Sequence, residues 1–412
     1  MTRPSAILTV LFVALLSTNA LAVTSYMTLD LRFYQHQGHY CPTSRTCTGA
    51  KYLQSQYNTN QPLQKMKVYL YRNGVLIGQG STGTDGRAAV SFTWPGPNQF
   101  AQVVIRFEEA NGRWVLRTTA NAVIQRSSTI LLPYAPKPEL PANVTITYGT
   151  SASPDQHANV FDGANKTWLN ALSQSAVMQS VFTGIVVKTF TDPGGTDCPT
   201  SCALGKVIKL DSNAPYAPSM RIMHEMGHVA DFLSHDGNDY AQRGCYLYPT
   251  TCGTPGSTPG VWNLTDPEWS SAAFEEGLAT FHATAALYGP NNGTPHVCLD
   301  SAVSCPASFY NVESVPTCPG DGRDPLAVTR YFWDTFDQIA DTPVYWPAGE
   351  TATPLEFATI LDTLAQFPAG TTNGAEDETT GIDADGRSLV DYRKYSSVPE
   401  TYYTTHCSPP GD

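Results

Sequence analysis

The chain has 412 residues and a formal net charge of −12 at neutral pH. Its length allows two domains and a large core, and its acidic balance argues against nucleic acid or an anionic membrane as a partner. Only 15% of the residues are charged, whereas the chain holds 32 glycines and 31 prolines. This composition favours a loop-rich extracellular protein.

The first 22 residues have the pattern of a secretory signal peptide. Arg3 gives a short basic start, residues 7–16 are almost all apolar, and Ala20-Leu21-Ala22 forms a small-x-small cleavage site. The apolar run is too short to span a membrane comfortably, and no later stretch is long and apolar enough to do so. We therefore expect a secreted protein, extracellular or periplasmic, that is monomeric and begins near Val23.

All ten cysteines follow the signal peptide. An even number in this context predicts disulfides formed in an oxidising compartment. Eight cysteines fall into close pairs that suggest local bridges, and Cys318 and Cys407 are left to tie the C-terminal tail. The close pairs are Cys41/Cys47, Cys198/Cys202, Cys245/Cys252 and Cys298/Cys305.

Residues 23–132 predict an antiparallel β-sandwich. Short alternating stretches are separated by turn signals, of which Asn73-Gly74 is a strong hairpin signal. The segment 68–92 resembles the small transthyretin-like and immunoglobulin-like modules that accompany many secreted enzymes, which implies an accessory domain. Strands are expected at 67–72, 75–77, 88–94, 102–108, 113–117 and 122–132.

Residues 133–142 predict a semi-rigid linker, because four of the ten are prolines. Beyond it, residues 143–412 are expected to form an α+β domain that is mainly helical with a small sheet. Strands are expected at 144–148, 184–190 and 206–210, and helices at 159–182, 220–233, 270–288, 323–339 and 355–367.

The predicted helix 220–233 contains the pattern His-Glu-x-x-His. His224 and His228 lie one helical turn apart, so both rings can reach one metal ion. Glu225 follows the first histidine and can take a proton from a water at such a site. The alternative interpretations are a chance pattern, or a helix with two partly exposed histidines and no metal.

A catalytic zinc ion usually has a third protein ligand. The metzincin arrangement is excluded because Asp231 and Ser234 stand where it requires Gly and His or Asp, and no methionine follows Met226. Asp236 and Asp239 are possible ligands just beyond the helix. Two further carboxylates, Glu275 and Glu276, lie in an otherwise apolar predicted helix, where an uncompensated charge is costly.

The sequence Glu276-Gly277-Leu278-Ala279 resembles the Glu-Gly-x-Ala pattern of the gluzincin zinc peptidases, the clan that contains thermolysin-like enzymes and zinc aminopeptidases. The resemblance covers the two motif helices and the order of elements. It implies a zincin-like fold, Zn²⁺ as the cofactor and Glu276 as the third ligand. It also implies an edge strand that binds an extended peptide, for which 206–210 is the candidate. The Gly-x-Met-Glu-Asn signature of the aminopeptidases is absent, and Thr280 stands where thermolysin-like enzymes have an acidic residue.

The clan also implies a mechanism and an activity. Glu225 would act as general base in a secreted zinc endopeptidase that cleaves protein or peptide substrates. Tyr331 is the leading candidate for a donor to the oxyanion, with His282, Tyr288 and His296 as competitors; its alternative role is that of a core aromatic residue. The alternative function is a binding or adhesion protein built on a zincin scaffold.

Overall fold

The computed structural model describes residues 24–34, 60–93, 99–132, 142–150, 155–191, 201–211, 219–234, 270–290, 295–297, 310–312, 325–336 and 356–366. The predicted signal peptide and nearly all of the predicted linker lie outside these residues. Of the ten cysteines only Cys202 is described; it is disulfide-bonded, and its partner lies outside the described residues. The predicted bridges therefore stay predictions.

One large mixed sheet dominates the described part of the chain. It has twelve strands, in the order β11-β12-β10-β7-β6-β3-β4-β5-β1-β2, with β8 beside β6 and β9 beside β1. The strands of the sheet are β1 (Thr24–Tyr34), β2 (Asn60–Pro62), β3 (Met66–Arg72), β4 (Val75–Ser81), β5 (Arg87–Thr93), β6 (Gln99–Glu109), β7 (Trp114–Arg117), β8 (Gln125–Leu132), β9 (Ala142–Tyr148), β10 (Ile185–Thr191), β11 (Cys202–Leu204) and β12 (Val207–Asp211). A separate pair, β13 (His296–Val297) and β14 (Tyr310–Asn311), is antiparallel.

This sheet corrects the expected fold class. A mainly helical zincin-like region with a small sheet is wrong, because strands make up 41% of the described residues and helices 39%. The sheet is also not purely antiparallel, since β9 runs parallel to β1 and β10 runs parallel to β7 and to β12. The physical reason is that strands on the two sides of the predicted linker hydrogen-bond to each other. The proposed division into domains at 133–142 stays a prediction.

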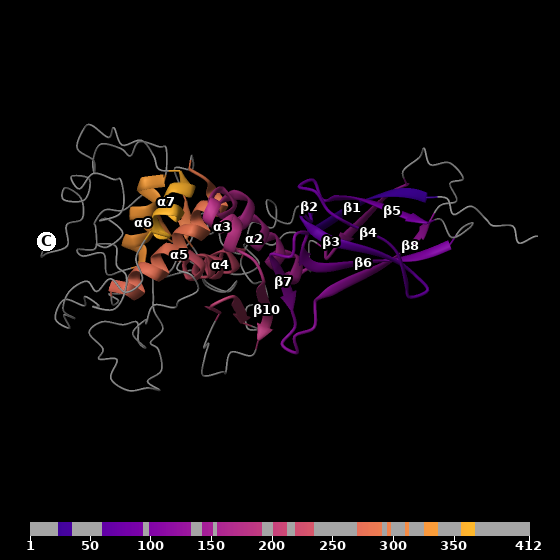
Figure 1. Ribbon diagram of the computed structural model, residues 1–412, viewed down its shortest axis with the longest axis horizontal. Coiled ribbons are helices and arrows are strands. Elements are labelled where there is room, and N and C mark those ends of the chain that lie inside the picture. Colours follow the sequence, from indigo (N-terminus) through magenta and orange to yellow (C-terminus); the bar gives the residue numbers. More distant parts are fainter. Residues whose placement is uncertain are drawn as a thin grey trace, which may run out of the picture.

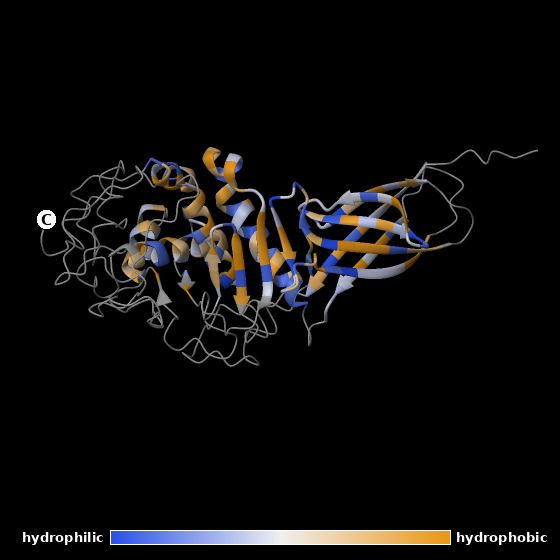
Figure 2. Cartoon of the chain, turned by 60° about the horizontal axis from the view of Figure 1, so that its bottom comes forward, coloured by the Kyte–Doolittle hydropathy of each residue, from blue (hydrophilic) through white to orange (hydrophobic). Residues whose placement is uncertain are grey.

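The strands β1, β3, β5, β6 and β8 contribute buried apolar residues to one core, as alternation along a strand predicts. Along β1 the residues Met27, Leu29, Leu31 and Phe33 are all buried, because successive strand side chains point to opposite faces. Figure 2 shows orange and blue residues alternating along these strands. The predicted hairpin is confirmed: β3 pairs with β4 around Asn73-Gly74, and both turn residues have positive φ.

The sheet then continues beneath the helices. β7 follows β6 through a tight turn and pairs with β10, which pairs with β12. The expectation that 206–210 forms the edge strand is wrong, because β12 lies between β10 and β11. Among the described strands, the edge at this end of the sheet is β11, which is antiparallel to β12.

Helices gather beside this end of the sheet, on the left in Figure 1. Phe161 and Trp168 of α2 contact Trp114 on β7, with ring centroids 6.4 Å apart in each case. The observed helix α5 has the bounds that the sequence predicts, and the single helix expected at 159–182 is divided into three. The helices are α2 (Gln156–Asn170), the 3₁₀ turn η1 (Leu172–Gln174), α3 (Ala176–Val181), α4 (Ser219–Ser234), α5 (Ser270–Tyr288), α6 (Pro325–Phe336) and α7 (Phe357–Leu364).

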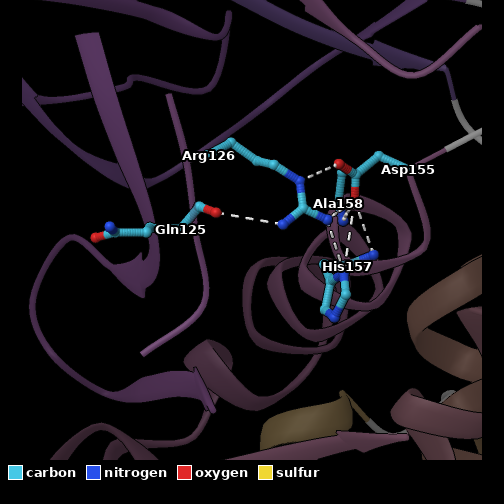
Figure 3. Close-up of polar contacts among 5 residues, drawn as sticks. All are labelled: Gln125, Arg126, Asp155, His157 and Ala158. Carbon is cyan, nitrogen blue, oxygen red and sulfur yellow. Dashed lines mark hydrogen bonds and ion pairs between the residues drawn. The ribbon is translucent and has the colours of Figure 1, made fainter. Parts of the chain in front are cut away.

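Polar contacts join the start of α2 to β8. Asp155 caps α2 by accepting hydrogen bonds from the backbone N–H groups of His157 and Ala158. Arg126 on β8 donates from Nε to Asp155 at 2.9 Å, and its Nη2 lies 2.9 Å from His157 Nδ1 (Figure 3). These contacts tie the start of α2 to β8. No helix in the described part of the chain is both long enough and apolar enough to cross a membrane.

Candidate metal centre

Two closely packed helices, α4 and α5, build the site. Gly227 on α4 faces the backbone of Ala279 on α5 so tightly that an added Cβ would lie 2.8 Å from the Ala279 Cα. Side chains on the facing sides of both helices are therefore brought within contact distance. Gly277 has the same function on the other side of α5, where a Cβ would meet Val328 and the Pro325 carbonyl of α6 at 2.4 and 2.6 Å.

Three side-chain atoms converge across this interface. His224 Nε2 lies 3.0 Å from Glu276 Oε2 and 3.1 Å from His228 Nε2. His228 Nε2 lies 3.3 Å from the same Glu276 oxygen. His224 and Glu276 are 5% exposed, so water cannot easily screen this cluster. The predicted ligand set of His224, His228 and Glu276 thus forms one buried group.

This group fits a metal ion. Zinc ligands lie about 2.0–2.1 Å from a tetrahedral ion, which places neighbouring ligand atoms about 3.3–3.4 Å apart. The observed edges of 3.0, 3.1 and 3.3 Å are close to that spacing. Two imidazole nitrogens and one carboxylate oxygen are also a common donor set for catalytic zinc. The cluster can therefore hold a metal ion; the identity of the metal belongs to the proposal below.

The three groups of the cluster shift one another's pKa values. Burial lowers the pKa of His228, but the Glu276 carboxylate and its hydrogen bond outweigh burial and raise that pKa well above its usual range. Burial raises the pKa of Glu276, but His228 and the hydrogen bonds from both histidines outweigh it and lower that pKa. Burial also lowers the pKa of His224 to about 4. Without metal, a proton on His228 therefore compensates the carboxylate.

The second ring nitrogen of His224 faces α5. Thr280 Oγ1 lies 3.2 Å from His224 Nδ1 and donates a hydrogen bond to the Glu276 carbonyl at 2.7 Å. Thr280 is fully buried. One hydroxyl thus contacts two of the three residues of the cluster.

Glu225 follows His224 on α4 and is 3% exposed. Burial raises the pKa of its carboxyl group to about 7, although His228 and Arg221 act in the opposite direction. A carboxyl group with such a pKa can accept and return a proton near neutral pH. This is the property that a general base at this position requires.

The other candidate residues lie as follows. Asp231 is on α4, one turn beyond His228, and does not belong to the metal-binding group found among the described residues. Asp236 and Asp239 lie outside the described residues. Tyr331 is on α6 and is 8% exposed, with its ring 5.2 Å from that of Phe332. Its role as an oxyanion donor stays a prediction.

The structure also places the three competing candidates for the oxyanion donor. Tyr288 ends α5 and His296 begins β13. His282 is fully buried on α5, and a Cβ at Gly227 would lie 3.1 Å from its Nδ1. Its ring packs against Phe357, with centroids 5.3 Å apart.

The sequence did not reveal the close contacts of Gly227 and Thr280, because both contacts depend on how α4 and α5 cross.

Comparison of the chain with protein-family models, with characterised proteins and with solved structures found no match. The case for the site therefore depends on its own geometry and chemistry.

Proposed function

We propose that this protein is a secreted zinc-dependent metallopeptidase, acting as an endopeptidase on protein or peptide substrates. The observation that carries the proposal is the buried triangle of His224 Nε2, His228 Nε2 and Glu276 Oε2, with Glu225 next to it in the chain. A zinc ion held there would polarise a peptide carbonyl and lower the pKa of a water molecule.

The protein's own residues supply the proton transfers. Glu225 takes the proton of the attacking water, and returns it to the nitrogen of the departing amine when the peptide bond breaks. In the metal-free structure, burial raises the pKa of this carboxyl group to about 7. Tyr331 remains the proposed donor to the oxyanion.

The sheet offers a place for an extended substrate. Among the described strands, β11 has a neighbour on one side only, and Leu204 at its end is 46% exposed. An extended peptide can pair with such an edge through its backbone. Phe232 on α4 packs against the Gly205 turn between β11 and β12, so this edge lies beside the helix that carries Glu225.

Glu225→Gln separates metal binding from catalysis. The variant should retain stoichiometric zinc, because residue 225 is not in the ligand triangle. Its kcat on an internally quenched peptide should fall by about 10²–10⁴-fold, which is the typical contribution of a general base. Zinc content and kcat are measured on the same preparation, and mass spectrometry locates the cleaved bonds.

Two results would contradict the proposal. Unchanged cleavage in Glu225→Gln would rule out the general-base role. A purified wild-type protein that binds zinc but cleaves no protein or peptide substrate would favour a binding or adhesion protein on the same scaffold.

A further inference from the structure

We propose that the pocket at the C-terminal end of α5 binds a small organic ammonium ion. The pocket has a volume of about 540 Å³, which is within the range of small-molecule sites. Residues from the ends of α2, α5 and α6 and from the start of α7 line it. The inference goes beyond the proposed function, because it depends on neither the metal centre nor peptidase activity.

The pocket is separate from the ligand triangle. The residues of α5 that line it, 285–288, follow Glu276 by nine to twelve positions. At 1.5 Å per residue, they lie about 14–18 Å further along the helix. None of the three residues of the ligand triangle lines the pocket.

Buried aromatic rings form the apolar floor of the pocket. Phe336 on α6 and Phe357 on α7 both line it, and they are 7% and 1% exposed. Their ring centroids lie 5.9 Å apart. Phe281 on α5 packs against both rings, with centroids 5.8 and 5.6 Å away. Three helices therefore hold this floor in place, and a ligand with an apolar part can rest on it.

The polar side of the pocket is negative. Glu356 lines it and immediately precedes α7, and its carboxylate makes no capping hydrogen bond to that helix. The last carbonyl groups of α5 add about half a negative charge, and the first turn of α7 adds about half a positive charge. These two partial charges offset each other, so the Glu356 carboxylate determines the sign. Among the described residues that line the pocket there is no lysine, arginine or histidine.

Two amide side chains at the exposed rim add acceptors. Asn170 donates from Nδ2 to the Ala286 carbonyl at 2.8 Å, and Gln174 donates from Nε2 to the Asn170 carbonyl at 2.6 Å. Each side chain thus directs an N–H group at the backbone and keeps an oxygen that can accept. An ammonium group has donors and no acceptor. It therefore matches a rim of one carboxylate and two amide oxygens, whereas an anion would be repelled by Glu356.

Three probes of nearly equal size separate charge from shape. Benzylammonium, benzyl alcohol and benzoate are a cation, a neutral molecule and an anion built on the same ring. Ligand-observed NMR titration of the full chain measures each dissociation constant. We expect benzylammonium to bind with a dissociation constant on the order of 1 mM, as suits so small a ligand. Benzyl alcohol should bind about fivefold more weakly, the effect of one exposed ion pair, and benzoate more weakly still.

The variants test which residues are responsible. Glu356→Gln should weaken benzylammonium binding about fivefold and leave benzyl alcohol binding unchanged. Glu108→Gln is the matched control, because it changes the net charge equally but lies on β6, which does not line the pocket. It should bind all three probes as wild type does. Ala358→Trp places a large ring in the pocket from the first turn of α7 and should abolish the binding of benzylammonium and benzyl alcohol.

Three results would overturn the proposal. They are benzyl alcohol binding as tightly as benzylammonium, Glu356→Gln behaving like Glu108→Gln, and Ala358→Trp retaining binding while its circular dichroism is unchanged. A fourth probe, Nα-acetyl-lysine methylamide, distinguishes two sources of the cation. Binding tighter than that of benzylammonium would support a lysine side chain of a peptide as the natural ligand, and weaker binding would support a free amine.

Discussion

His224 and His282 are both buried histidines on facing helices, but their surroundings are opposite. His224 has Glu276 and His228 beside one ring nitrogen and Thr280 beside the other. Among the described atoms, neither ring nitrogen of His282 has a partner that meets hydrogen-bond geometry. Burial lowers the pKa of both, to about 4 for His224 and about 3 for His282. The comparison teaches that neighbouring polar groups, and not burial, distinguish a histidine that could hold a metal ion from one that fills the core.

The largest expected effect comes from removing a partner of His224. Glu276→Gln takes away the carboxylate but keeps the size of the side chain. Zinc affinity should fall on the order of 1,000-fold, more than the 10–100-fold typical of lost outer-shell partners, because a direct ligand is lost. Glu275→Gln, its half-buried neighbour, is the matched control and should bind zinc within a few-fold of wild type. Equal affinities in the two variants would show that Glu276 is not a ligand.

The sequence predicted one side of this comparison well. His224, Glu225 and His228 come from a local pattern, and the bounds of α5 follow from its uninterrupted apolar run. Glu276 required a resemblance to a known clan in addition, since an adjacent carboxylate, Glu275, has the same local surroundings in the sequence. The geometry that brings the residues together depends on Gly227, and no local pattern reveals which backbone a glycine will face.

The order and pairing of the strands in the sheet were less predictable for the same reason. Alternation along the chain marked the strands on both sides of the predicted linker. It did not reveal that β9 would pair with β1, or that β7 would pair with β10. Strand partners depend on contacts between distant segments, whereas alternation reports only which face of a strand is buried.

The second prediction concerns His282. The folded state favours neutral His282, whose pKa is lowered from 6.5 to about 3 by burial first, although Asp231 opposes the shift. The stability that it contributes is therefore present above pH 6.5 and is lost as the pH falls towards 3. Between pH 6.5 and 4 the loss is about 3 kcal/mol, at roughly 1.4 kcal/mol per pH unit.

His282→Leu should remove this acid sensitivity and leave the protein at least as stable at pH 7. His282→Gln is the control, because it keeps a polar side chain that does not titrate. Urea unfolding of metal-free protein at pH 4.5, 5.5 and 7 measures the free energy of unfolding. A wild-type pH dependence retained in both variants would mean that His282 does not have the lowered pKa.

The third prediction concerns Gly227, which lies between the two histidines. In an unconstrained helix, Gly→Ala stabilises by about 1 kcal/mol. Here the new Cβ would lie 2.8 Å from the Ala279 Cα and 3.0 Å from its carbonyl oxygen, and backbone atoms cannot move aside easily. Gly227→Ala should therefore lower the free energy of unfolding by about 2 kcal/mol, within the usual range for overpacking, and also weaken zinc binding. An increase in thermal stability would contradict the observed closeness of α4 and α5.

The smallest effect is expected at His157, which has surroundings between those of His224 and His282. Its Nδ1 lies 2.9 Å from Arg126 Nη2, and Arg126 also contacts Asp155 at 2.9 Å. Burial first, and then the Arg126 charge, lower the pKa of His157 to about 4. Arg126→Met removes that charge, so this pKa should rise towards 6.5 and part of the acid sensitivity from His157 should disappear. At pH 7 the lost contacts should lower the free energy of unfolding by about 1 kcal/mol or less, since the Arg126 side chain is 36% exposed and water screens it.

Zinc affinity of the Arg126→Met variant should not change, because these contacts join β8 to α2 and not α4 to α5. A large change in zinc binding would instead show that the direction of α2 controls the spacing of the ligand triangle.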